Sequence, residues 1–247
     1  MSRIAFVLTG LMMLTACGKH DGPIAQKIVD QIVGEDGLVK PLYLVDKVIQ
    51  AGVPANVANL SMMKYDEFSS KVKKTRHMVI VDFTQTSEKK RMYLIDAETG
   101  TVDAMHVAHG EGSDPDDDGY AQYFSNTPGS RMSSLGSYLV QERYVGKWGA
   151  SMKLDGLERT NSNARKRVVV MHPASYVKDQ SEKKQGLSWG CPATPFDWID
   201  TLIERLRDGS FMYIYGENEY RESAEDLLLQ QMSLLPNFKW IDESDPR

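Results

Sequence analysis

Val168-Val169-Val170-Met171-His172-Pro173 is the stretch that decides the fold, and Ser188-Trp189-Gly190-Cys191-Pro192 follows it closely. A run of β-branched residues is typical of a buried strand, and this run ends on a histidine. Glycine and proline on either side of Cys191 indicate a tight loop. A thiol nucleophile needs a base that takes its proton and later returns it to a leaving amine. We therefore expect His172 and Cys191 to meet at one site, as base and nucleophile.

Apolar segments around this stretch alternate with polar turns, which is typical of a mainly β domain. Further extended segments are expected at 78–83, 91–96, 101–108, 136–140 and 210–216, with a turn at 144–149. A helix is expected directly after Cys191, because Thr194 suits an N-cap position and Pro195 the first helical position. Gly209 would end this helix.

The chain has 247 residues, which is enough for one sizeable domain with appendages. Apolar residues at helix spacing before the first strand predict a helical lead-in or tether over 18–75. We place the domain that holds His172 and Cys191 at 76–217. A C-terminal helix with a polar tail is expected at 218–247.

The N-terminus has the pattern of an export signal. Arg3 precedes an apolar run at 4–13 that is too short to span a bilayer. The run leads into Leu14-Thr15-Ala16-Cys17, which resembles the signal of a bacterial lipoprotein. The resemblance implies that residues 1–17 hold the signal, that cleavage occurs before Cys17, and that this cysteine is acylated. An uncleaved anchor or plain secretion is the alternative.

This expectation places the protein in the cell envelope, facing the periplasm and held to a membrane by lipid on Cys17. Cys17 is followed by Gly18 rather than by an aspartate, which resembles the signal for sorting to the outer membrane. The net charge of −5 gives no global basic field, so we expect no nucleic-acid partner.

The chain contains only two cysteines, Cys17 and Cys191. Acylation of the first would leave a single thiol, which cannot form an internal disulfide. A lone thiol in an exported protein is open to oxidation, so a chemical task for Cys191 is the favoured interpretation. An inert buried cysteine is the alternative.

The segment 109–137 is rich in glycine, serine and aspartate and is long for a connection, so we expect it to help form a site. Within it, Asp114, Asp116 and Asp118 follow the spacing of a calcium-binding loop. Ser125 stands where such a loop needs its closing glutamate, so the motif is incomplete and a solvated acidic loop is the alternative. No HExxH or paired-cysteine spacing occurs, so we expect no catalytic metal.

Several short stretches, taken in order, resemble the L,D-transpeptidase (YkuD-like) catalytic domain family, and most closely its murein L,D-transpeptidase branch. The central signature is the spacing from His172 to Ser188-x-Gly190-Cys191. The resemblance extends over about residues 75–216. The other stretches are 81–83, 109–110, 124–126, 129–130, 133–136, 144–146 and 163–164.

The resemblance implies an α+β fold, mainly a β-sandwich, with flanking N- and C-terminal helices. It implies action on peptidoglycan stem peptides, with Cys191 attacking a carbonyl at an L–D junction to form an acyl-enzyme as D-alanine leaves. An amine of another stem would then form a 3→3 cross-link, whereas water would make the protein an L,D-carboxypeptidase or amide hydrolase. A non-catalytic, murein-binding lipoprotein is the remaining alternative. The resemblance also implies that no cofactor is needed and that carbapenems acylate the thiol.

The loop around the nucleophile has further expected roles. Exposure beside a histidine is expected to lower the pKa of the Cys191 thiol. Ser188 and Gly190 are expected to support the loop and the oxyanion site. Pro192 has no N–H, so the oxyanion donors must come from Cys191, Gly190 or the long loop.

The sequence departs from the better-known branch of the family at Trp189, where that branch has a histidine, and at Pro173 and Pro192. These departures leave base and nucleophile intact and alter the walls of the substrate site, so the acceptor stays open. A fold-supporting role is the alternative for several candidate substrate contacts. These candidates are Trp189, Ser133, Ser134, Gly136, Asn163, Arg165 and Arg167.

Overall fold

The computed structural model describes residues 39–217, with side chains from Leu44 onward. The expected signal at 1–17 with Cys17, the lead-in up to residue 38, and the C-terminal helix and tail at 218–247 lie outside the described residues. Within the part that is described, no helix combines the length and the apolar character needed to cross a membrane.

Two helices precede the sheet. Helix α3 (Val39–Gln50) ends before Gly52, and α4 (Ala55–Phe68) continues into a short 3₁₀ turn, η1 (Ser69–Lys71). Contacts divide the chain into two compact units, 1–44 and 45–247. Of the first unit, the structure describes only residues 39–44, which begin α3.

Eight strands form one mixed sheet in the order β3-β2-β1-β8-β4-β5-β6-β7. The pairs β1/β8 and β6/β7 are parallel and the other neighbours are antiparallel. A bridge from Ala108, just after β3, to Ala193 in β7 links the two ends of the sheet, which is therefore nearly barrel-like. The strands are β1 (Lys74–Asp82), β2 (Met92–Asp96), β3 (Val102–Met105), β4 (Gly136–Gly146), β5 (Gly149–Gly156), β6 (Val170–Pro173), β7 (Ala193–Thr194) and β8 (Ser210–Tyr215).

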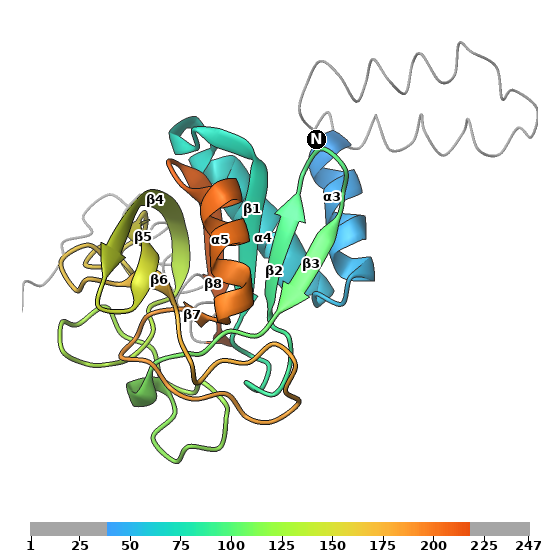
Figure 1. Cartoon of the computed structure of the whole chain (residues 1–247). Helices are drawn as coiled ribbons and strands as arrows, with labels where there is room; N and C mark the ends of the chain where they lie inside the picture. The colour runs from blue at the N-terminus through green and yellow to red at the C-terminus, as the bar shows by residue number, and fades with distance from the viewer. Residues whose placement is uncertain (1–38, 218–247) are drawn as a thin grey trace, which may run out of the picture. The chain divides into compact units, whose positions relative to one another are not determined.

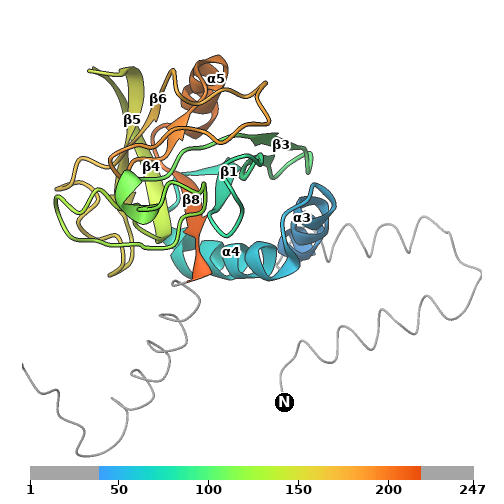
Figure 2. The same cartoon turned by 90° about the horizontal axis from the view of Figure 1, so that it is seen from below.

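The sheet is covered on both faces at its centre, where Figure 2 shows α4 and α5 (Phe196–Leu206) on opposite sides of β8. Met212 and Ile214 of β8 join a core that includes side chains of α5 and of strands from both halves of the sheet. Phe211 points the other way, and its ring meets Tyr65 of α4 edge-on at 5.4 Å. Burial on both faces explains why β8 carries a continuous run of large apolar and aromatic side chains from Phe211 onward. The expected α+β fold is confirmed within residues 45–217, where α4 and α5 flank the strands, and the expected sandwich takes the form of one nearly barrel-like mixed sheet (Figure 1).

Three local expectations were wrong by a few residues. Strand β6 begins at Val170, because Val168 has a left-handed backbone (φ 56°) and its N–H donates to the carbonyl of Arg165 in a turn. Helix α5 has Pro195 as its N-cap, while Thr194 lies in β7. The hairpin of β4 and β5 is longer than expected, with a turn of only two residues, Lys147 and Trp148.

Candidate functional site

The register of β6 and β7 brings His172 and Cys191 to one place. His172 pairs with Ala193, which stands two residues after Cys191. Both side chains line a pocket of about 600 Å³. Its charged lining residues are all cationic, namely Arg131, Lys147 and Arg167. The pocket therefore suits an anionic ligand, although the whole chain carries a net charge of −5.

His172 is buried, and its Nδ1 lies 3.0 Å from the carbonyl oxygen of Pro173. Because a carbonyl only accepts, Nδ1 carries the proton and Nε2 keeps a free lone pair in the neutral ring. Burial lowers the pKa of His172, and the bond to Pro173 offsets part of this effect. The imidazole is therefore neutral and able to accept a proton near pH 7.

The thiol of Cys191 accepts a hydrogen bond from the N–H of Val170 at 3.5 Å and lies 3.7 Å from the carbonyl oxygen of Val168. Burial raises the pKa of the thiol, although the Val170 N–H and the Arg167 charge act in the opposite direction. The expectation of a lowered thiol pKa is therefore wrong. Within residues 44–217 no hydrogen bond joins Sγ to the His172 ring, so a thiolate–imidazolium pair is not preformed.

Ser188 ties the nucleophile loop together. Its hydroxyl donates to the carbonyl of Cys191 at 2.6 Å and accepts from the N–H of Gly190 at 3.1 Å. Gly190 takes a left-handed conformation with φ 107°, which glycine adopts without strain. Because the Gly190 N–H is already engaged by Ser188, the N–H of Cys191 is the remaining backbone donor of this pair.

The family model of the L,D-transpeptidase catalytic domain matches residues 50–215, well over half of the chain. The chain belongs to this family. The match begins before the expected domain boundary at 76 and includes α4. No curated protein matches the sequence.

Solved structures of L,D-transpeptidases are distantly similar. The enzyme from Mycobacterium smegmatis is 10% identical, with 57% of this chain and 59% of that chain covered and a TM-score of 0.36. The enzyme from Stackebrandtia nassauensis is 13% identical, with 66% and 65% covered and a TM-score of 0.36. LdtMt1 in complex with imipenem is 11% identical, with 57% and 59% covered and a TM-score of 0.35. This chain thus spans less than two thirds of the length of these three proteins.

Two of the seven candidate substrate contacts line the pocket of the L,D-transpeptidase domain. Trp189 is 68% exposed, and the guanidinium of Arg131 lies 4.8 Å from its ring centre. Arg167 is half-buried and donates to the carbonyls of Ser125 and Met132, so it also holds the long loop.

The other five candidates make contacts within the fold and are not part of the pocket lining. The Ser133 hydroxyl accepts from the N–H of Gly110, and the Ser134 hydroxyl meets that of Tyr138 at 2.7 Å. Arg165 forms ion pairs with Asp155 and Glu142. Asn163 bonds to Asn126, and Gly136 takes a left-handed backbone at the start of β4.

Sequence reasoning missed the aromatic and cationic residues on the hairpin of β4 and β5. Trp148 stacks on the His172 ring, with centres 5.3 Å apart and planes 19° apart. Tyr144 and Lys147 of the same hairpin line the pocket, as does Tyr176 from a loop. The glycines predict the turn at 144–149, but no pattern in the sequence indicates that this turn lies over His172.

The carboxylates of Asp114, Asp116 and Asp118 lie within 4.8 Å of one another and are the one group of possible metal ligands in the described part of the chain. Asp116 and Asp118 are exposed, and the Gln122 amide donates to both. Asp114 is buried and accepts from the N–H groups of Asp118 and Gly119. These contacts are those of a loop that holds itself together, so calcium binding stays an untested expectation.

Proposed function

We propose that this protein is a peptidoglycan-modifying cysteine L,D-transpeptidase that forms an acyl-enzyme on Cys191, with His172 as its base. The observation that supports this most strongly is the parallel register of β6 and β7, which brings both residues to one cationic pocket. Membership of the L,D-transpeptidase catalytic domain family gives the reaction class.

The proposed reaction begins with the thiol, because burial keeps it protonated. Nε2 of His172 takes the proton as Sγ attacks the stem-peptide carbonyl, and the N–H of Cys191 stabilises the oxyanion. The C–N bond then breaks, and His172 returns its proton to the departing amine of D-alanine. An amine of a second stem attacks the thioester, forms the new amide and releases the thiol.

The pocket lining supports an anionic substrate. Arg131 and Lys147 line the same pocket as Cys191 and His172, and no acidic residue joins them in the lining. Stem peptides carry carboxylates, which such cations attract. Lipid on Cys17 would hold the enzyme on the periplasmic face of a membrane, for which we propose the outer membrane.

Acylation by a carbapenem tests the proposal. The solved LdtMt1 structure contains imipenem, so we expect imipenem to add covalently to Cys191 here. Intact-mass spectrometry of the purified protein should show one adduct, absent in Cys191→Ala and formed at least about tenfold more slowly in His172→Ala.

Absence of an adduct on the folded wild-type protein would contradict the acyl-enzyme. Product analysis with stem peptides then decides the acceptor. A cross-linked dimer made in the presence of a second stem supports transpeptidation, whereas hydrolysis alone supports a carboxypeptidase.

A further inference from the structure

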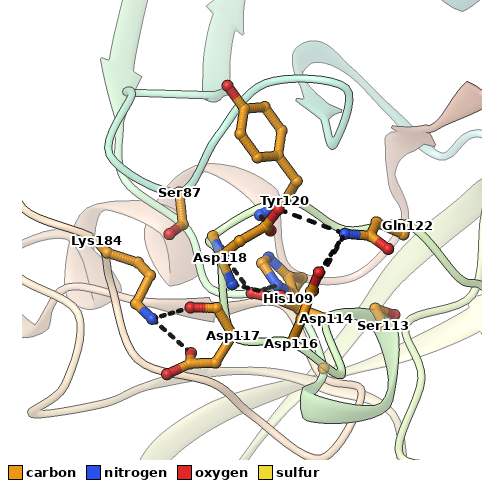
Figure 3. Close-up of polar contacts among 12 residues, drawn as sticks. Ser87, His109, Ser113, Asp114, Asp116, Asp117, Asp118, Tyr120, Gln122 and Lys184 are labelled. Atoms are coloured by element: carbon orange, nitrogen blue, oxygen red, sulfur yellow. Dashed lines mark hydrogen bonds and ion pairs between the residues drawn. The ribbon is translucent and has the colours of Figure 1, made fainter.

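A chain of three buried polar side chains lies behind the nucleophile loop. Arg91 is fully buried and donates from Nη2 to Nδ1 of His109 at 2.6 Å. His109 is also fully buried, and its Nε2 lies 3.3 Å from Oδ2 of Asp114. Figure 3 shows the His109 ring beside Asp114, with Asp116, Asp117 and Asp118 around them.

The protonation of this chain is fixed by its donors. Arginine only donates, so Nδ1 of His109 accepts and Nε2 carries the proton toward the carboxylate. Burial and the neighbouring Arg91 charge lower the pKa of His109 to about 3, so the ring is neutral near pH 7. Arg91 keeps its charge, because burial lowers its pKa only to about 9 and the carboxylates of Asp82 and Asp114 oppose that effect.

The backbone of His109 is what contacts the nucleophile loop. Its carbonyl oxygen accepts from the N–H of Ser188 at 2.8 Å and lies 3.2 Å from the hydroxyl oxygen of Ser188. That same hydroxyl donates to the carbonyl of Cys191. Ser188 therefore links the His109 carbonyl to Cys191 through hydrogen bonds.

The next two residues extend this contact. The N–H of Glu111 donates to the carbonyl of Ser188 at 2.8 Å. Gly110 packs directly on Gly190, and a Cβ built on Gly110 would lie only 2.8 Å from the Cα of Gly190. Backbone meets backbone here, so a small shift of the 109–111 segment moves the cysteine loop with it.

We propose that Arg91, His109 and Asp114 are positioning residues, which hold segment 109–111 so that the Cys191 N–H lies where the oxyanion forms. This inference rests on the proposed function. A buried set of charged and polar side chains is not needed for stability, since apolar groups of similar volume stabilise a core as well or better. Its contribution is geometric. The hydrogen bonds fix the orientation of the His109 ring and hence the position of the His109 carbonyl.

Asp114→Asn tests the proposal, since it keeps the shape of the side chain and removes the charge that faces His109. Asp116→Asn is the matched control, because Asp116 lies on the same loop, is exposed and, among the residues that the structure describes, accepts only from the Gln122 amide. For each protein we would measure the imipenem binding constant, the acylation rate constant and the alkylation rate of Cys191 by iodoacetamide. All rates are compared at a temperature where circular dichroism shows every variant folded.

Acylation needs the oxyanion donor in place, whereas alkylation does not. We therefore expect Asp114→Asn to slow acylation by about tenfold or more, with imipenem binding and alkylation changed less than about twofold. Asp116→Asn should match the wild type. Unchanged acylation in Asp114→Asn would overturn the proposal, as would equal losses of acylation and alkylation, which indicate general damage.

Hydrogen exchange of the wild-type protein is a second measurement that needs no variant and no turnover. The amides of Glu111 and Ser188 bond across the two segments, so both should open together as one unit. Opening equilibria that differ by more than about tenfold would contradict the coupling. If the wild type fails to react with imipenem, the proposed function fails, while exchange still decides whether the segments are coupled.

Discussion

His109 illustrates how burial of one residue makes the stability of the domain depend on pH. In the folded protein its pKa is about 3, whereas in the unfolded chain it is near 6.5. Between these values the unfolded chain binds a proton that the folded protein excludes, so stability falls as the pH is lowered through this window. From pH 7 to pH 5 the loss from this residue is about 2 kcal/mol.

Urea unfolding of the wild type and of His109→Gln at both pH values measures this loss. We expect the wild type to lose about 2 kcal/mol more than the variant between pH 7 and pH 5. The comparison isolates His109, because His172 and the carboxylates titrate in both proteins. Equal losses in the two proteins would contradict a neutral, buried His109.

At the residue scale, the sequence indicated the proposed nucleophile and the proposed base but not their electrostatic surroundings. A strand-end histidine and a cysteine between glycine and proline are local patterns, and the structure places both at one pocket. The raised pKa of Cys191 could not be predicted, because it depends on which distant segments bury the thiol. The left-handed backbone of Val168 was also missed, since β-branched residues strongly favour extended conformations.

Among the elements, the hairpin of β4 and β5 has the most direct effect on the site. Trp148 at its tip covers the His172 ring and helps to exclude water from it. Because burial is the main cause of the lowered His172 pKa, removal of Trp148 should raise that pKa toward its ordinary value near 6.5.

The pH dependence of imipenem acylation measures this effect. Only the neutral ring accepts a proton, so the rate falls as the pH drops through the His172 pKa. We expect the acidic limb of Trp148→Ala to lie at higher pH than that of the wild type. Val145→Ala is the control, since Val145 lies on the same hairpin and is exposed but is not part of the pocket lining. Coincident acidic limbs would show that Trp148 does not shield the base.

The positions of most strands could be predicted from the sequence, but the lengths of the strands could not. Strands β2 and β8 follow their apolar segments closely, because nearly all their side chains are buried, whereas β1 begins at Lys74, four residues before its expected segment, with exposed side chains at 74–76. The hairpin was underestimated because β4 and β5 continue through charged residues such as Glu142 and Lys153, which pair with each other on the surface. Sequence periodicity detects burial, so it misses strands that face water.

At the scale of the whole molecule, the proposed lipid anchor predicts a clean separation of functions between the two cysteines. Metabolic labelling with an alkyne fatty acid in a bacterial host should label the wild type and Cys191→Ala but not Cys17→Ser. Cys17→Ser should still react with imipenem, because residues 45–217 hold the pocket. Label that persists in Cys17→Ser, or is absent from the wild type, would contradict the anchor.

The parallel pairing of β1 with β8 has a consequence for how this chain folds. The two central strands start 136 residues apart, at Lys74 and Ser210, and β8 also joins β1 to β4. Local hairpins such as β1–β2 and β4–β5 close over short loops, but the facing edges of β1 and β4 stay unpaired until the last strand arrives. A nascent or truncated chain that lacks β8 therefore exposes two unpaired strand edges, which makes it a target for aggregation and proteolysis.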